Sequence, residues 1–178
     1  MKPYFIVVGR SASGKSVLLS HLLADTGIRK TKTATTRPMR EGESSDAYIF
    51  CSEPEFMRTP MLECGEYSGY MYGTPISGAK ETDISLLDPI GAGKIKVAMA
   101  QAGRKCYIIG LDCSPQLAKK RMCGRGDSHD DITRRIEVDS ERFANVKEIA
   151  DLYIQDFDID LHYSKVLAFM LKCCMEER

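Results

Sequence analysis

With 178 residues, of which 43% are hydrophobic, the chain is long enough to bury one core domain that carries inserted lobes. Its 25 Lys and Arg residues balance 25 Asp and Glu residues. This zero net charge argues against a general binder of nucleic acid or of an anionic membrane, because such proteins carry a marked basic excess. No apolar run approaches the roughly 20 residues of a membrane span. The first ten residues also lack a small-residue cleavage site, so we expect a cytoplasmic protein.

The first element is an apolar run, Pro3 to Val8, that predicts a buried strand. The loop GRSASGKS, Gly9 to Ser16, follows it, and the sequence VLLSHLLA after the loop predicts a helix. A strand, a glycine-rich loop and a helix in this order are typical of a phosphate-binding P-loop. Lys15 can then reach the outer phosphates of a nucleotide, and the hydroxyl of Ser16 can bind Mg²⁺. The residues expected at the phosphates are Gly9, Ser11, Ala12, Ser13, Gly14, Lys15 and Ser16.

A small lobe is expected next. Residues 31–50 are polar, carry Arg37 and Arg40, and end in the strand-like sequence AYIF. A short helix is expected over EPEFMRT, and the segment from Met61 to Pro75 has the pattern of two short strands around a turn. These elements predict a lobe of mixed sheet, over residues 33–82, inserted after the first strand and helix.

From residue 83 onward, expected strands and helices alternate. The expected strands are Asp83 to Asp88, Cys106 to Asp112 and LYIQD. The expected helices cover residues 91–103, 132–150 and 160–178, and a further helix begins at Ser114 and Pro115. A polar turn is expected from Gly124 to Asp131. This alternation predicts an α/β fold with a doubly wound parallel sheet. We expect the core to comprise residues 1–32, 83–123 and 145–178, and a short lid to comprise residues 124–144.

The seven cysteines do not predict a metal site or disulfides. Their number is odd, and they form no C-x-x-C pair or Cys/His spacing. We therefore expect free thiols in a reducing compartment. The three histidines lie far apart in the sequence, and none is expected to act as a ligand or base.

The P-loop, the segments TTRPMREGESSDAYIF and MLECGEYSGYMYGTP, and the later KKRMCGRG and RRI together resemble the guanylate kinase family, in order and over nearly the whole chain. Members of this P-loop kinase family transfer the γ-phosphoryl group of ATP to GMP. The resemblance implies that Arg37, Arg40, Tyr48 and Tyr72 hold the GMP phosphate, and that Thr33, Glu63, Thr74 and Asp88 bind the guanine. It also implies that Arg125 and Arg135 close over ATP, and that Lys15, Arg37, Arg125 and Arg135 act in catalysis with ATP and Mg²⁺.

The implied partners are small nucleotides, not nucleic acid or a membrane, and the chain is expected to be a monomer or a homodimer. Guanine chemistry supports the role of Glu63, because one carboxylate can accept the N1–H and N2–H₂ donors together, whereas adenine has a lone acceptor at N1. The alternative for Glu63 is a solvent-facing strand residue. For Tyr48 and Tyr72 it is packing in the core of the lobe.

Several positions depart from the family pattern. The segment after Thr74 is short, Leu86 stands where the family commonly has an acid, and Arg10 replaces a proline in the P-loop. Two other functions therefore stay open: a related kinase for another small phosphorylated acceptor, and a non-catalytic binding module, which the intact P-loop disfavours. We expect the side chain of Arg10 to point to solvent more readily than to a phosphate.

Overall fold

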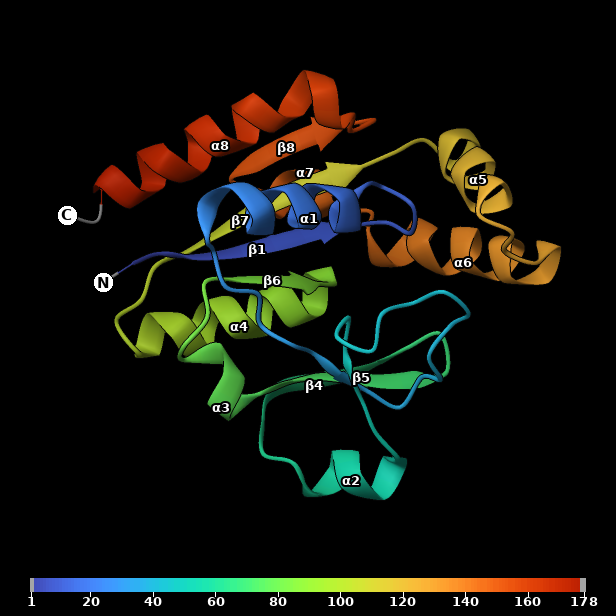
Figure 1. Cartoon of the computed structure of the whole chain (residues 1–178), viewed down its shortest axis with the longest axis horizontal. Helices are drawn as coiled ribbons and strands as arrows, with labels where there is room; N and C mark the ends of the chain where they lie inside the picture. Colours follow the sequence, from blue (N-terminus) through green and yellow to red (C-terminus); the bar gives the residue numbers. More distant parts are fainter. Residues whose placement is uncertain (1, 177–178) are drawn as a thin grey trace.

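The computed structural model describes residues 2–176. Its core is a parallel sheet with the strand order β6-β1-β7-β8 (Figure 1). The central strand pairs on both sides, so that Val7 lies opposite Leu86 on one neighbour and Ile109 on the other. The strands are β1 (Tyr4–Gly9), β6 (Ile84–Leu87), β7 (Cys106–Asp112) and β8 (Leu152–Gln155). The predicted strands are confirmed to within a few residues.

Helices cover both faces of this sheet. Phe5 and Val7 point into a hydrophobic cluster with α1 and α8, whereas Tyr4, Ile6 and Val8 point to the opposite face, where α4 and α7 pack. Figure 1 shows α8 above the sheet and α4 below it. The helices are α1 (Lys15–Thr26), α4 (Pro89–Gln101), α7 (Val146–Ile149) and α8 (Ile159–Glu176). The prediction of a doubly wound α/β core is confirmed, and none of the helices within residues 2–176 is long and apolar enough to cross a membrane.

The inserted lobe is a mixed sheet, as predicted, and its strand order is β3-β2-β5-β4. Strands β2 and β3 pair in parallel, and the other pairs are antiparallel. Its elements are β2 (Ala34–Thr35), β3 (Ile49–Phe50), α2 (Glu53–Arg58), β4 (Met61–Tyr67) and β5 (Tyr70–Pro75). The short segment after Thr74 forms a single turn, α3 (Ile76–Ala79), whose Ala79 is buried in the same cluster as α4. The lobe is thus joined to the core by a short connection.

The helices after Gly124 differ from the prediction. A single helix was expected over residues 132–150, but the chain forms α6 (His129–Arg142) and a separate α7, after the helix α5 (Pro115–Gly124). Helix α6 begins early because the side chain of Ser128 accepts the N–H of Asp131, which is a strong N-cap. It ends where Phe143 turns inward and is buried in the core. The burial of this aromatic ring outweighs the continuous helical period of the sequence.

Arg10 does not point to solvent, contrary to the sequence-based expectation. Its Nε lies 2.8 Å from Oδ1 of Asp112, and both side chains are largely buried. The other carboxylate oxygen of Asp112 accepts the hydroxyl of Tyr153 at 3.2 Å. This ion pair connects the P-loop with Asp112, the last residue of β7.

Replacing Asp112 by alanine is expected to lower the free energy of unfolding by about 1–3 kcal/mol, because the guanidinium of Arg10 would stay buried without its partner. Urea denaturation measures the change. Glu81→Ala is the matched control, since Glu81 is exposed in the bend that follows α3, and surface changes of this kind usually stay within about 0.5 kcal/mol. Equal stabilities of the two variants would show that the Arg10–Asp112 pair contributes nothing to the fold.

Candidate active site

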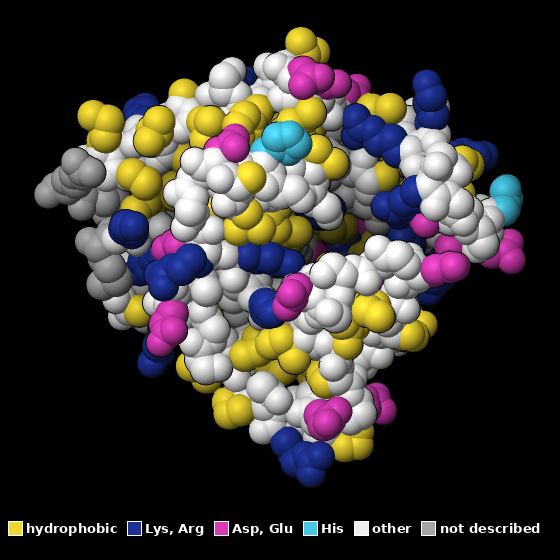
Figure 2. Space-filling view, viewed as in Figure 1, with side chains coloured by type: hydrophobic (Ala, Val, Ile, Leu, Met, Phe, Trp, Pro, Cys, Tyr) yellow, Lys and Arg dark blue, Asp and Glu magenta, His cyan; other side chains and the backbone are white. Residues whose placement is uncertain are grey.

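A cleft of about 230 Å³ lies between the carboxyl ends of the core strands, the small lobe and the lid. Figure 2 shows this hollow, with Lys and Arg side chains at its edge on the side of α5 and α6. Most of the residues predicted from the sequence line it: Gly9, Ser11, Ala12, Lys15, Ser16, Thr33, Arg37, Arg40, Tyr48, Glu63, Tyr72, Asp88, Arg125 and Arg135. Ser13, Gly14 and Thr74 are not among the lining residues. The structure therefore brings together residues that are more than a hundred positions apart.

The P-loop has the backbone shape that its glycines predict. Gly14 adopts a left-handed conformation with φ of 100°, directly before the first residue of α1, and a Cβ there would lie 2.6 Å from Cδ1 of Phe157. A Cβ at Gly9 would lie 2.0 Å from the carbonyl oxygen of Leu111, so only glycine fits there. The first turn of α1 thus points its unpaired N–H groups, and the positive end of its dipole, at the cleft.

Lys15 lies across this loop. Its ammonium donates to the carbonyl oxygens of Gly9 and Arg10, each at 2.6 Å. Burial lowers the pKa of Lys15 to about 8, although the charge of Asp139 acts in the opposite direction. The ammonium is therefore held close to the loop, in a position from which it can turn to a phosphate.

This pKa predicts how phosphate binding depends on pH. A nucleotide triphosphate stabilises the ammonium and raises its pKa, so affinity is full below the pKa of the unliganded protein and falls as the pH rises through about 8. Calorimetric titration with ATP from about pH 7 to about pH 9.5 should show that the affinity for ATP falls and that binding is accompanied by proton uptake. The proton is taken up by Lys15, because the phosphates are already ionised in this range. Lys15→Arg is the control: arginine keeps its charge throughout, so its affinity should stay flat. A parallel decline in both proteins would mean that another group titrates.

The arginines predicted from the sequence, four in number, line the cleft, and acidic side chains pair with three of them. Arg37 is buried, and its guanidinium donates to both carboxylate oxygens of Glu43, at 2.8 and 2.9 Å. Arg125 and Arg135 both face Asp127, at 2.5 and 3.6 Å. Burial would raise the pKa of Asp127, but the hydrogen bond from Arg125 and the charges of the surrounding arginines together outweigh it and lower that pKa. The fourth arginine is Arg40, whose pKa is lowered by burial and by the charges of Arg135 and Arg37.

Such a concentration of permanent positive charge favours a polyanion. The carboxylates of Glu43 and Asp127 accept the guanidinium N–H groups, and the oxygens of a bound phosphate can replace them as acceptors. Two tyrosines complete this wall: Tyr48 and Tyr72 pack edge to face at 6.2 Å, and the guanidinium of Arg37 lies over the ring of Tyr48 at 5.4 Å.

Glu63 forms the deeper end of the cleft. It is buried on β4, and its Oε1 accepts the hydroxyl of Thr74 at 2.7 Å. Burial, together with the nearby charge of Asp88, raises the pKa of Glu63. A Cβ at Gly91 would lie 3.1 Å from Oε2 of Glu63 and 3.2 Å from Oδ1 of Asp88, so the two carboxyl groups converge on one point. Thr33 is buried nearby and lines the same end of the cleft.

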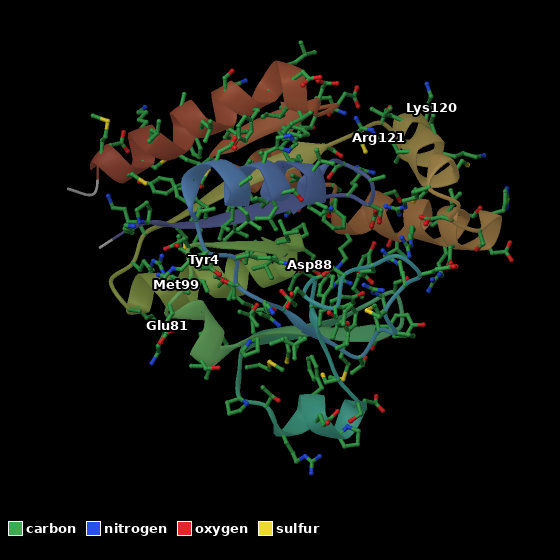
Figure 3. The ribbon with its side chains drawn as sticks, in the orientation of Figure 1. Tyr4, Glu81, Asp88, Met99, Lys120 and Arg121 are labelled. Atoms are coloured by element: carbon green, nitrogen blue, oxygen red, sulfur yellow. The ribbon has the colours of Figure 1, made fainter. Side chains whose placement is uncertain are left out.

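Asp88 already has partners on both oxygens. Its Oδ1 accepts the N–H of Gly91 at 2.7 Å as the N-cap of α4, and its Oδ2 accepts Nε of Arg142 at 2.6 Å. Figure 3 labels Asp88 where β6 ends, above the small lobe. Glu63 is therefore the carboxylate with more of its accepting capacity available to a ligand.

Sequence reasoning missed four residues around this cleft. Asp139, Arg142 and Tyr67 connect the lid to the P-loop and the lobe, and Arg121 donates to the carbonyl oxygens of Ala12, at 3.0 Å, and Phe157. Figure 3 labels Arg121 on α5. One signal was present in the sequence: Arg135, Asp139 and Arg142 follow a spacing of four and three, which puts all three on one face of a helix.

The chain matches the protein family described as guanylate kinase over residues 1–173. It is 36% identical to the guanylate kinase of Neisseria gonorrhoeae over 145 aligned positions, and the match covers 74% of this chain and 69% of that protein. It is 29% identical to the guanylate kinase of Halalkalibacterium halodurans over 187 aligned positions, covering 97% and 90% of the two chains. The crystal structure of a guanylate kinase from Anaplasma phagocytophilum superimposes with a TM-score of 0.72 at 20% identity, over 97% of this chain and 86% of that one.

Proposed function

The chain belongs to the guanylate kinase family, and on this premise we propose how its residues transfer the γ-phosphoryl group of ATP to GMP. It is an ATP-dependent nucleoside monophosphate kinase. The observation that supports the assignment of roles is the single cleft in which the P-loop faces Glu63 across a group of arginines. ATP and GMP would enter this cleft from opposite sides, with their phosphates meeting in its middle.

On the donor side, the backbone of the P-loop would hold the ATP phosphates, and Lys15 would move from the carbonyl oxygens of Gly9 and Arg10 to the β- and γ-phosphates. Ser16 is exposed at the start of α1 and lines the cleft, where its hydroxyl suits a Mg²⁺ ion. Residues 2–176 offer no cluster of three or more acids, histidines or cysteines for a metal. Mg²⁺ would therefore be held mainly by nucleotide phosphates and water, and it would neutralise charge on the transferred group.

On the acceptor side, Arg37, Arg40, Tyr48 and Tyr72 would hold the phosphate of GMP. Its oxygens would replace Glu43 on the guanidinium of Arg37. Glu63, oriented by Thr74, would accept N1–H and N2–H₂ of the guanine, with Thr33 and Asp88 beside it. Leu86, where the family commonly has an acid, lines the cleft with an apolar side chain.

The transfer itself requires positioning and charge stabilisation. The GMP phosphate is already ionised and needs no general base. Lys15, Arg37, Arg125 and Arg135 would stabilise the charge on the transferred group, and the lid over residues 124–144 and the lobe over residues 33–82 would close on the core of residues 1–32, 83–123 and 145–178. Closure excludes water that would otherwise hydrolyse ATP.

A coupled assay of ADP release tests this function, with Mg²⁺-ATP as donor and a panel of nucleoside monophosphates and sugar phosphates as acceptors. We expect a strong preference for GMP. Turnover with another acceptor alone would contradict the guanine assignment, and no turnover together with weak ATP binding would mean a binding module.

We also propose a cytoplasmic location, which the seven free thiols support because they suit a reducing compartment. Light scattering after size-exclusion chromatography distinguishes a monomer from a homodimer.

A further inference from the structure

Asp139 is a buried carboxylate at the point where the P-loop, the lid and the small lobe meet. It lies on α6 and is 3% exposed. Its Oδ2 accepts the backbone N–H of Ser11 at 2.6 Å, and its Oδ1 accepts the hydroxyl of Tyr67 at 2.5 Å. The hydroxyls of Ser11 and Tyr67 are themselves 3.4 Å apart. One carboxylate from the lid thus contacts the donor loop and the acceptor lobe at the same time.

The Tyr67 side of this bridge leads directly to the proposed GMP site. Burial, and then the charge of Asp139, raises the pKa of Tyr67, so its phenol stays a hydrogen-bond donor. The ring of Tyr67 packs edge to face against Tyr72 at 6.1 Å, and the guanidinium of Arg142 lies over it at 5.1 Å. Arg142 in turn pairs with Asp88. A displacement of Tyr67 would therefore disturb two residues of the acceptor end, Tyr72 directly and Asp88 through Arg142.

The Ser11 side leads to the ATP site. Ser11 belongs to the P-loop, four residues before Lys15, and the charge of Asp139 also acts on that ammonium. Arg135 lies one helical turn before Asp139, on the same face of α6, and is one of the arginines that line the cleft. A buried carboxylate with two charge-assisted hydrogen bonds resists separation from its partners, because breaking either bond leaves one carboxylate oxygen buried without a partner. The P-loop, α6 and the small lobe are therefore expected to move together.

We propose that Asp139 is a positioning residue that couples the two substrate sites, by holding the P-loop and the acceptor lobe to the lid helix through Ser11 and Tyr67. The proposal rests on the two-substrate reaction described above. When one nucleotide orders its side of the cleft, the carboxylate holds the other side in the closed arrangement, so the second nucleotide binds a site that is already formed. Neither Asp139 nor Tyr67 needs to touch a reacting atom in this role.

The test compares the affinity for a non-hydrolysable ATP analogue in the absence and presence of GMP, by calorimetry, together with kcat and both KM values. Wild-type protein is expected to bind the analogue about 5–50-fold more tightly with GMP present, within the usual range of coupling between sites. Tyr67→Phe removes one hydrogen bond and keeps the ring. It should bring that factor close to 1 and lower kcat about tenfold, while the affinity for each nucleotide alone changes less than about twofold.

Asp139→Asn separates geometry from charge. Its amide oxygen can still accept the N–H of Ser11, and its NH₂ can donate to the hydroxyl oxygen of Tyr67, so the coupling factor should be retained to within about threefold. Ser140→Ala is the control on the same helix, because Ser140 is exposed and its hydroxyl donates only to the backbone of Glu137 among the described residues. It should behave as wild type.

Two results would overturn the proposal. One is an unchanged coupling factor and kcat in Tyr67→Phe. The other is weaker GMP binding by Tyr67→Phe when the ATP analogue is absent, which would make Tyr67 a direct contact of GMP. Failure of the proposed function is distinguishable, since wild-type protein would then fail to phosphorylate GMP at all.

Discussion

Replacing Lys15 by alanine is expected to lower kcat about 10³-fold, which corresponds to ~4 kcal/mol of transition-state stabilisation. Its ammonium lies 2.6 Å from the carbonyl oxygens of Gly9 and Arg10. In this half-buried position a fixed charge acts strongly on the charge that develops on the transferred group. Alanine leaves the cleft with its arginines but without a cation at the β- and γ-phosphates.

The matched control for this change is Lys120→Ala. Lys120 is exposed on α5 and is labelled at the outer side of that helix in Figure 3. Single-turnover kinetics with saturating nucleotides measures the chemical step, and the midpoint of thermal unfolding separates lost chemistry from lost fold. A Lys15→Ala protein that stays folded and turns over within about threefold of wild type would rule out the proposed role of the P-loop lysine.

The features that the sequence predicted well are local ones. The P-loop is specified by neighbouring residues: β-branched and apolar residues in β1, two glycines at fixed positions, and the helical sequence VLLSHLLA after Ser16. The strand from Cys106 to Asp112 is also predicted to the residue, because a continuous apolar run ends at a charged residue. Such signals need no knowledge of what lies across the fold.

The features that were missed depend on pairs that are distant in sequence. Asp139 meets Ser11 and Tyr67 across 128 and 72 positions, and neither contact has a local pattern. Arg10 looked like a solvated arginine until β7 placed Asp112 beside it. Asp88 could be predicted as a residue of the acceptor end, but its commitment to Arg142 and to the cap of α4 could not. Spacing indicates which residues share a face, whereas the partner of that face is set by tertiary packing.

Replacing Glu63 by glutamine is expected to lower kcat/KM for GMP about 10³-fold and to reduce the preference for GMP over AMP by a similar factor. The shape of the site is kept, and the hydroxyl of Thr74 can still donate to the amide oxygen. Guanine, however, presents two adjacent donors, whereas glutamine offers one acceptor and one donor in place of the two acceptors of the carboxylate. The amide N–H₂ then opposes a guanine N–H inside a buried site, where an unsatisfied pair is costly.

The same amide is complementary to adenine, which offers an acceptor at N1 beside a donor at N6, so AMP should lose little or gain. Glu66→Gln is the control for the chemical change: Glu66 lies on the same strand, three residues further along, but is exposed. Initial rates with GMP and AMP over a range of concentrations measure both specificity constants. If Glu63→Gln and Glu66→Gln keep the same selectivity as wild type, the guanine lies elsewhere in the cleft, and the convergence of Glu63 and Asp88 on Gly91 has another role.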